Sequence, residues 1–284
     1  MNSHPALKPG NVAVITGAAS GIGLAAAKKF AGLGMKIAMA DVDPALQEVA
    51  ANEVAPLCKN AKTDVLALPV DVSVLTQVQQ LKNRVWERFG RADVLMNNAG
   101  VGAPAGSWDH YGAWQKILDV NLWGCINGVQ TFTEPMLAQQ TPGLIINTGS
   151  KQGITCPPGN TAYNVSKAAI KALTEGLQHS LRSVEGGKVS AHLLVPGFTY
   201  TGMMKKRLPE KPPAAWTSEQ VIDYLLERLA QNDFYIICPD NEVTAEMDRK
   251  RILWAAGDVV ENRPALSRWH PDYQPAFEKF VAKK

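Results

Sequence analysis

A glycine-rich turn that joins a short apolar strand to a helix constrains the fold of this chain more than any other feature. Val12 to Ile15 is apolar and rich in β-branched residues, and the segment TGAASGIG follows it directly. Gly17, Gly21 and Gly23 permit a tight turn and let backbone N–H groups approach a pyrophosphate at the start of a helix. The helical pattern that follows has apolar members at Leu24, Ala27, Phe30 and Leu33. The segment therefore predicts the first unit of a dinucleotide-binding fold.

The rest of the chain repeats the alternation of strand and helix. Apolar runs predict six further strands, at residues 36–40, 65–70, 93–96, 144–147, 189–195 and 234–238. Helical patterns lie between them, at 44–60, 76–89, 162–177 and 218–229 and as a long apolar helix within 108–136. Strands that alternate with helices build a parallel sheet through right-handed crossovers. We therefore expect an α/β, Rossmann-type, doubly wound fold with a seven-stranded parallel sheet and helices on both faces.

Length and composition fit one such domain with an appendage. The 284 residues are 46% hydrophobic and 19% charged, which supplies a buried core and carries no signature of disorder. The expected core spans about residues 10–240. Residues 198–216 are rich in Met, Lys and Pro and predict a mobile lid over a site. Residues 241–284 form a C-terminal extension with a helix over 243–256.

Charge and cysteine usage argue against several classes of protein. The net charge of +3 is spread along the chain and the basic clusters at 205–207 and 249–251 are short, so no nucleic-acid partner is expected. The cysteines are far apart and lack histidines at ligand spacing, which predicts neither a metal site nor a disulfide framework. They are Cys58, Cys125, Cys156 and Cys238. Reduced thiols, the lack of an apolar N-terminal segment and the lack of a run of about 18 apolar residues favour a cytoplasmic protein with no membrane partner.

Asp41 ends the second predicted strand, where the adenosine ribose of a dinucleotide lies in such folds. Its carboxylate can accept hydrogen bonds from both ribose hydroxyls and would repel a 2′-phosphate. Neither the glycine turn nor the two positions after Asp41 hold an arginine or a lysine. These features favour NAD over NADP. The alternative is a structural carboxylate at the strand end, ahead of the helix start at Asp43-Pro44.

Ser150, Tyr163 and Lys167 form the candidate reactive site. Tyr163 and Lys167 are four residues apart, so a helix over 162–177 would project them from one face. A phenol has a pKa of about 10, and a unit positive charge at roughly 4 Å stabilises its phenolate by about 4 kcal/mol at an effective dielectric of about 20. Lys167 would thus lower the pKa of Tyr163 by up to about three units towards neutrality, where a general acid/base works best, before desolvation of both groups subtracts from that effect. The Ser150 hydroxyl could hold the substrate oxygen that Tyr163 protonates or deprotonates.

Motifs elsewhere in the chain decide between this chemistry and an ordinary solvated helix face. Asn97-Asn98-Ala99-Gly100 ends the fourth predicted strand, on the sheet edge where ligands bind in open α/β folds. Asn121 lies among apolar residues of the long helix and needs hydrogen-bond partners. Each also has a structural interpretation, as a simple tight turn for the first and as a satisfied core asparagine for the second.

The set and order of these motifs resembles the classical short-chain dehydrogenase/reductase family. The motifs are TGAASGIG at 16–23, NNAG at 97–100, Asn121, Ser150, Tyr163-x-x-x-Lys167 and Pro196-Gly197, and the match spans about residues 10–240. The resemblance implies a Rossmann fold that binds NAD(P)(H). It implies that Tyr163 is the acid/base, that Lys167 binds the nicotinamide ribose and lowers the pKa of Tyr163, and that Ser150 orients the substrate oxygen. Asn121 would hold a water molecule in a proton relay.

The resemblance also implies which residues bind cofactor and substrate. Asp71 and Val72 would meet the adenine, Asn98 to Gly100 the adenosine side, and Pro196 to Thr201 the nicotinamide. The full expected cofactor set is Gly17, Ser20, Gly21, Ile22, Gly23, Asp41, Val42, Asp71, Val72, Asn98, Ala99, Gly100, Tyr163, Lys167, Pro196, Gly197, Thr199 and Thr201. The expected substrate set is Ser150, Gln152, Tyr163 and Met203.

The chain departs from the family pattern at three points. Gly149 precedes Ser150 where many members carry a second serine, and Thr199 replaces the usual aliphatic residue after Pro-Gly. The tail after Asp240 is longer and lacks the common glycine-rich ending. These departures bear on the oligomer interface and the substrate pocket. Residues that could wall that pocket, or belong to the core instead, are Trp108, Tyr111, Met203, Met204, Trp216, Trp254 and Trp269.

The sequence thus predicts a NAD-dependent oxidoreductase, an alcohol dehydrogenase or ketoreductase, that interconverts a secondary alcohol and a ketone or aldehyde. A NADP-linked carbonyl reductase is the nearest alternative, and a non-catalytic dinucleotide-binding regulator belongs to another class. A sugar-nucleotide epimerase or dehydratase fits the glycine spacing and the length less well. Apolar surface on the two long helices predicts a homodimer or homotetramer.

Overall fold

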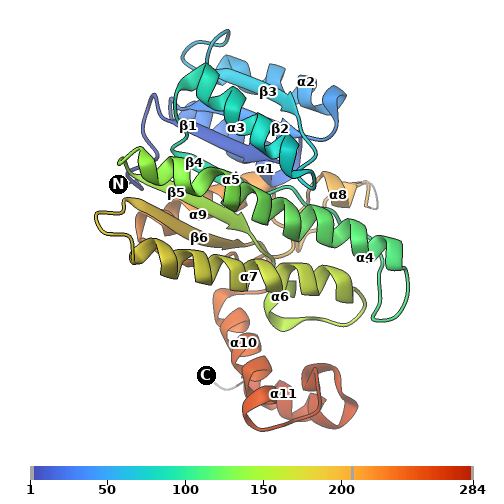
Figure 1. Cartoon of the computed structure of the whole chain (residues 1–284). Coiled ribbons are helices and arrows are strands. Elements are labelled where there is room, and N and C mark those ends of the chain that lie inside the picture. The colour runs from blue at the N-terminus through green and yellow to red at the C-terminus, as the bar shows by residue number, and fades with distance from the viewer. Residues whose placement is uncertain (1–2, 206–207, 283–284) are drawn as a thin grey trace.

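The computed structural model describes residues 3–205 and 208–282, and a seven-stranded parallel sheet forms its centre (Figure 1). The spatial order of the strands is β3-β2-β1-β4-β5-β6-β7, so the chain winds outward from β1 in one direction and from β4 in the other. This order confirms the predicted Rossmann-type, doubly wound sheet. The strands are β1 (Val12–Thr16), β2 (Lys36–Asp41), β3 (Val65–Pro69), β4 (Val94–Asn97), β5 (Gly143–Thr148), β6 (Val189–Val195) and β7 (Tyr235–Ile237).

Helices cover both faces of the sheet because successive strand residues point to opposite sides. Ile15, Met39 and Ile146 pack with α1 (Gly21–Gly32), α2 (Pro44–Val54) and α9 (Ser218–Ala230) on one face. Val14, Leu95 and Ile145 pack with α3 (Leu75–Phe89), α5 (Gly124–Ala138) and α7 (Thr161–Arg182) on the other. Each of these buried aliphatic side chains contributes about 1.5–3 kcal/mol of hydrophobic free energy. The two cores hold the strand ends in fixed positions, and those ends carry the site.

Two predicted helices differ from the observed ones. The helix expected over 44–60 ends at Val54, and a 3₁₀ turn over Ala55–Leu57 follows. Pro56 explains this ending, because its ring has no N–H and clashes with the carbonyl one turn earlier. The long apolar helix expected within 108–136 consists of α4 (Tyr111–Ile117), a π-helical segment (Leu118–Trp123) and α5, in one continuous run.

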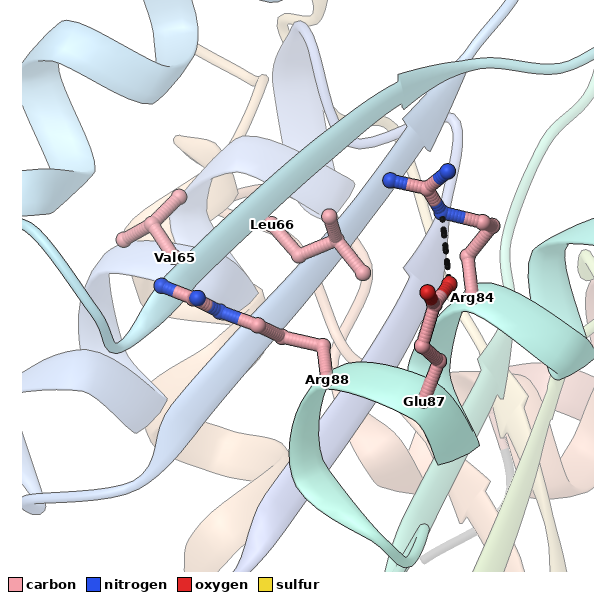
Figure 2. Close-up of a pocket in the computed structure, with 5 residues that line it drawn as sticks. All are labelled: Val65, Leu66, Arg84, Glu87 and Arg88. Atoms are coloured by element: carbon pink, nitrogen blue, oxygen red, sulfur yellow. Dashed lines mark ion pairs between the residues drawn. The ribbon is translucent and has the colours of Figure 1, made fainter.

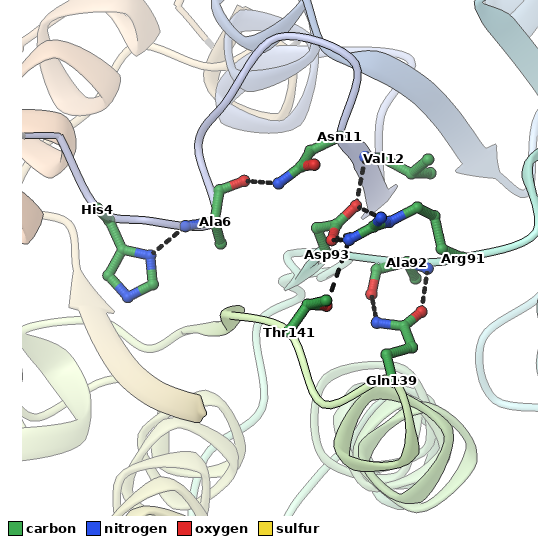
Figure 3. A network of polar contacts seen from close by, with 9 residues as sticks. All are labelled: His4, Ala6, Asn11, Val12, Arg91, Ala92, Asp93, Gln139 and Thr141. Atoms are coloured by element: carbon green, nitrogen blue, oxygen red, sulfur yellow. Dashed lines mark hydrogen bonds and ion pairs between the residues drawn. The ribbon is translucent and has the colours of Figure 1, made fainter. Parts of the chain in front are cut away.

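A polar network fixes the amino ends of the central strands (Figure 3). Asp93 accepts a hydrogen bond from the backbone N–H of Val12 at 2.9 Å and forms an ion pair with Arg91. The Gln139 side chain both donates to and accepts from the backbone of Ala92, each at 2.9 Å. These contacts join β1, β4 and the end of α5 at the edge of the sheet opposite the strand carboxyl ends.

Backbone hydrogen bonds join the two ends of the segment over 198–216. Trp216 donates its N–H to the Phe198 carbonyl, and Tyr200 donates its N–H to the Trp216 carbonyl, both at 2.9 Å. The short helix α8 (Gly202–Lys205) lies within this loop. The predicted lid is thus a closed loop whose two ends form a small bridge next to Pro196-Gly197.

The C-terminal extension is helical and projects from the α/β core beyond α6 (Gln152–Thr155) (Figure 1). Its first helix, α10, spans Ala245–Val260, later at both ends than the predicted 243–256, and α11 (Gln274–Ala282) is a helix that the sequence did not predict. Trp254 forms the centre of a small separate core, with ring centroids 5.4 Å from Phe277 and 5.3 Å from Phe280. Of the helices within the described residues, none combines the length and the apolar character needed to cross a membrane.

Candidate functional site

The glycine turn between β1 and α1 packs against the turn after β4. Gly17 and Gly21 have φ angles of 63° and 56°, a region that glycine adopts without strain. A Cβ on Gly23 would stand 2.1 Å from the Gly17 carbonyl oxygen, and a Cβ on Gly17 would stand 2.8 Å from Ala99 Cα. Backbone therefore contacts backbone, with no room for side chains. The N–H groups at the start of α1 are left facing the space where an anion would bind.

Thr16 and Asn98 lock this arrangement. The Thr16 hydroxyl accepts hydrogen bonds from the N–H groups of Asn98 and Ala99, at 3.0 and 3.1 Å. The Asn98 amide donates back to the Thr16 carbonyl at 3.1 Å. The Asn98 side chain thus braces the two turns. Thr16 was not among the predicted site residues, although it opens the TGAASGIG motif.

Asp41 lies at the carboxyl end of β2 and is directed at the glycine turn. Its carboxylate accepts hydrogen bonds from the N–H groups of Ala19, at 3.0 Å, and Asp43, at 3.3 Å. Within the described ranges, no lysine or arginine forms an ion pair with Asp41. Asp41 does not cap the following helix α2. Asp43 caps it instead, because its side chain accepts hydrogen bonds from the N–H groups of Ala45 and Leu46.

Three further residues of the predicted cofactor set are Val42 and the pair expected to meet the adenine, Asp71 and Val72. Val42 is exposed, whereas Val72 is buried against Gly124. Asp71 accepts hydrogen bonds from the Ser73 N–H at 2.9 Å and from the Ser73 hydroxyl at 2.6 Å. Asp71 and Val72 thus form a firmly held turn at the carboxyl end of β3, beside Asp41 on the neighbouring strand.

Ser150, Tyr163 and Lys167 come together at the carboxyl end of β5. The Ser150 hydroxyl hydrogen-bonds the Tyr163 phenol. The Lys167 ammonium donates to the Thr148 carbonyl at 2.8 Å and lies 5.6 Å from the centroid of the Tyr163 ring. Asn160 fixes the start of α7, since its side chain accepts the Tyr163 N–H at 3.4 Å. The helix then carries Tyr163 and Lys167 on one face, as the spacing predicts.

Burial governs the electrostatics of this cluster. It raises the pKa of Tyr163, and the hydrogen bond from Ser150 opposes the rise. The net direction is opposite to the lowered pKa predicted from sequence. The physical reason is that both members of the pair lose water, and burial also lowers the pKa of Lys167 to about 8. A neutral phenol held by Ser150 is suited to giving a proton to a carbonyl oxygen.

Lys167 makes a pH-dependent contribution to stability that can be measured. Its pKa falls on folding from 10.5 to about 8. Between these values the unfolded chain holds a proton that the folded protein has released, so the free energy of unfolding rises with pH, by up to about 1.4 kcal/mol per pH unit. Below this window both states carry the charge and the contribution is flat. We expect denaturant titrations across the window to show the free energy of unfolding of the wild type rising relative to that of Lys167→Met, and equal slopes would contradict the assignment.

Asn121 is 1% exposed and lies in the π-helical segment. Its side-chain oxygen accepts the Val101 N–H at 2.7 Å, and its amide donates to the Val101 carbonyl and to the Ser166 hydroxyl, both at 3.1 Å. A Cβ on Gly100 would stand 3.4 Å from the Asn121 oxygen and 3.7 Å from the Lys167 ammonium. Asn121 therefore joins the turn after β4 to α7 and helps to set the position of Lys167.

The segment after β6 returns to the glycine turn. A Cβ on Gly21 would stand 3.2 Å from Thr201 Cβ, so Thr201 packs against the turn. Thr199 is buried and donates its hydroxyl hydrogen to the Gly197 carbonyl at 3.2 Å. Thr201 thus joins the segment after β6 to the glycine turn, and the Pro196 carbonyl joins the same segment to the residue after Ser150 by accepting the Lys151 N–H at 3.3 Å.

The predicted substrate residues are placed in part. Gln152 begins α6 and donates its N–H to the Ser150 hydroxyl at 3.2 Å, whereas the Met203 side chain lies outside the described residues. Trp254 belongs to the core of the extension, and Trp216 packs edge to face on Tyr224. Trp108 and Tyr111 are exposed, at 95% and 75%.

A hollow of about 430 Å³ lies away from this cluster, between the start of β3 and the end of α3 (Figure 2). Arg84, Glu87 and Arg88 project over Val65 and Leu66 there. It opens at the amino end of β3, whereas Ser150 follows the carboxyl end of β5. Sequence reasoning did not assign a function to it, and its residues have no contact with the cluster around Tyr163.

The residues at the strand carboxyl ends fit a nicotinamide dinucleotide. The cradle at Gly17 and Gly23 would be filled by any Cβ, and the Asp41 carboxylate accepts an N–H group of the same turn. Thr201 packs on Gly21, and the Lys167 ammonium lies beside Gly100. Such a cofactor supplies the acceptor or donor of a hydride. The chain supplies an anion cradle, a ribose acceptor and a proton-bearing phenol.

Comparison with known proteins agrees with this geometry. The family model described as short chain dehydrogenase matches residues 11–212. The chain is 32% identical over 264 residues to the 1-deoxy-11-beta-hydroxypentalenate dehydrogenase of Streptomyces exfoliatus. The aligned residues cover 90% of this chain and 93% of that protein.

Two solved structures are similar over most of their length. A short chain dehydrogenase/reductase from Burkholderia phymatum in complex with NAD is 33% identical, with a TM-score of 0.66, over 95% of this chain and 92% of that one. A metagenomic short-chain oxidoreductase in complex with NADP is 25% identical, with a TM-score of 0.67, over 82% of this chain and 98% of that one.

Proposed function

The chain belongs to the short-chain dehydrogenase/reductase family, and on that premise we propose that it is a NAD-dependent oxidoreductase that interconverts a secondary alcohol and a ketone or aldehyde. The observation that carries the proposal is the meeting of Ser150, Tyr163 and Lys167 at the carboxyl end of β5, beside the glycine cradle. Open α/β sheets bind their ligands along this edge.

Each side chain has a separate task. The Ser150 hydroxyl, which hydrogen-bonds the phenol, orients the substrate oxygen. Tyr163 gives a proton to that oxygen during reduction and accepts one during oxidation. Lys167, held by the Thr148 carbonyl, binds the ribose nearest the nicotinamide and stabilises the phenolate when the proton has left. Because the pKa of Tyr163 is raised, oxidation should gain rate as the pH rises above neutrality.

The proposed substrates are hydroxyl-bearing small molecules, and the hydroxy-acid relative named above makes secondary hydroxy acids the first class to test. A screen of secondary alcohols and hydroxy acids, read by the absorbance of NADH, tests the reaction class. Turnover with one of them in the presence of NAD supports it. A folded protein that binds NADH and oxidises no member of a broad panel would instead be a dinucleotide-binding regulator.

Asp41 is the proposed determinant of NAD preference. In Asp41→Ala, KM for NAD should rise about tenfold, because two hydrogen bonds between ribose hydroxyls and a carboxylate are lost, while the barrier to a 2′-phosphate falls. The ratio of kcat/KM for NAD to that for NADP measures the change. Asp43→Asn is the matched control, since it removes a nearby charge and keeps an oxygen to cap α2. A wild-type protein that turns over only with NADP would contradict the proposal.

We also propose a homodimer or homotetramer in the cytoplasm. Trp123 and Val165 are exposed on the α5 and α7 side of the molecule, at 53% and 42%, which supports burial against another copy. The free thiols Cys58, Cys125, Cys156 and Cys238 support a reducing compartment. Light scattering of the purified protein tests the first of these proposals.

A further inference from the structure

A buried ion cluster joins the residue after Ser150 to the C-terminal extension. The Lys151 ammonium lies 2.6 Å from an Asp248 oxygen on α10 and 3.5 Å from an Asp240 oxygen. The side chain of Lys151 is 18% exposed, and those of Asp240 and Asp248 are 6% and 7% exposed. Most ion pairs among the described residues have an exposed member, where water screens the charges, whereas this cluster is shielded.

The backbone of Lys151 belongs to the loop between β5 and α6, residues 149–151, which carries Ser150 and is called the catalytic loop below. Its N–H donates to the Pro196 carbonyl at 3.3 Å, and its carbonyl accepts the N–H groups of Ile154 and Thr155 at 3.0 and 3.1 Å, which closes the turn of α6. The Ser150 hydroxyl is contacted in turn by the Gln152 N–H from that same turn. Lys151 therefore anchors the turn that contacts the Ser150 hydroxyl.

The side chain of Lys151 also crosses the loop after β6. A Cβ on Gly197 would stand 2.9 Å from the Lys151 ammonium, so the lysine lies directly over this glycine. Asp240 accepts the Phe198 N–H at 3.4 Å with the same oxygen that faces Lys151. One ammonium thus connects the loop of Ser150, the base of the 198–216 segment and the extension.

Among the described residues, Lys151 is the cation that forms an ion pair with both carboxylates. Burial raises the pKa of Asp248, Lys151 opposes the rise, and the charge of Asp240 adds to it. Without the ammonium, two buried carboxylates would repel each other and α10 would lose its attachment to α6. Arg251 on the next turn of α10 also favours the charged form of Asp248, but no described contact joins it to the catalytic loop.

We propose that Lys151 is a positioning residue for Ser150, and that the C-terminal extension takes part in the reaction by holding Lys151 through Asp248, together with Asp240 at the end of the core. This inference rests on the proposed function, since it assigns the extension a task in that same site. The extension acts as a brace that sets the geometry of the serine hydroxyl relative to Tyr163.

The test compares Lys151→Met, Asp248→Asn and Lys151→Arg with the wild type in the full chain. In Lys151→Met and Asp248→Asn, kcat per folded protein should fall at least about tenfold, because sub-ångström displacement of an orienting group costs rate at this scale. The double variant that combines Lys151→Met with Asp248→Asn should be no slower than the slower of the two single variants, since both substitutions remove the same contact. Lys151→Arg keeps the cation and should recover most of the rate. Binding of NADH, measured by fluorescence, should stay within about threefold.

Glu246→Gln is the matched control, because it removes an exposed carboxylate from the same helix, whose ion-pair partner Lys250 is on that helix as well. It should leave kcat unchanged. Limited proteolysis adds a readout that needs no substrate: the extension should be released faster in Lys151→Met and Asp248→Asn than in Glu246→Gln. A folded Lys151→Met protein with wild-type kcat, or one slowed without release of the extension and without rescue by arginine, would overturn the inference. If the wild type oxidises no alcohol, the proposed function fails, and proteolysis still decides whether the cluster holds the extension.

Discussion

Tyr163→Phe should oxidise a secondary alcohol at least about a hundredfold more slowly than the wild type, with its affinity for NADH nearly unchanged. Phenylalanine keeps the ring and its packing on α7 and removes the hydroxyl that Ser150 hydrogen-bonds. The substrate oxygen then has no proton donor or acceptor in contact with it. Steady-state kinetics measure the turnover, and NADH fluorescence measures the binding.

Tyr235→Phe controls for the loss of a tyrosine hydroxyl as such. The Tyr235 phenol, on β7, donates a hydrogen bond to the Glu175 carboxylate. Glu175 lies on α7, as Tyr163 does, but close to the surface. We expect this variant to keep wild-type turnover. Undiminished turnover in Tyr163→Phe would remove Tyr163 from the reaction and with it the role of Lys167.

Gly23→Ala should abolish measurable NADH binding and lower the free energy of unfolding by about 1–3 kcal/mol or more. The added methyl group would stand 2.1 Å from the Gly17 carbonyl oxygen and 2.7 Å from the Asn98 amide nitrogen. Because the nearest atom belongs to the backbone, the turn itself must move. Its N–H groups then no longer converge on a phosphate.

Gly32→Ala, at the end of the same helix, is the matched control. A Cβ there meets no atom within 4 Å, so we expect unchanged NADH binding and stability within about 1 kcal/mol of the wild type. Equilibrium denaturation and fluorescence titration of both variants give the comparison. Wild-type affinity in Gly23→Ala would show that the turn does not hold the dinucleotide.

Local patterns in the sequence predict most of the sheet. The strand over 189–195 is found with the same bounds as β6, and the other strands differ by one or two residues at their ends. Buried parallel strands are continuous apolar runs, and each is bounded by glycine, asparagine or aspartate, so their limits are visible. Helix ends are harder to predict, and Pro56 shortens α2 by a clash that apolar periodicity does not register.

Some residues of the candidate site can likewise be predicted from local sequence, and others cannot. Tyr163 and Lys167 are brought together by helix geometry alone, and the glycines by a local turn, so sequence is sufficient for both. The partners of Asn121 and of Lys151 come from distant elements, and no local pattern links Lys151 to Asp248. The direction of the Tyr163 pKa shift was predicted wrongly because the cost of burial depends on the packed structure.

The π-helical segment over Leu118–Trp123 amounts to one additional residue within an otherwise α-helical run. Deleting a single residue there would let the run return to regular α-helical hydrogen bonding. It would also turn the preceding helix, Tyr111–Ile117, by about 100° about its axis. The Asn121 side chain would then lose its hydrogen bonds to Val101 and Ser166. A one-residue deletion in this helix would therefore displace the support of Lys167 without changing any reacting residue.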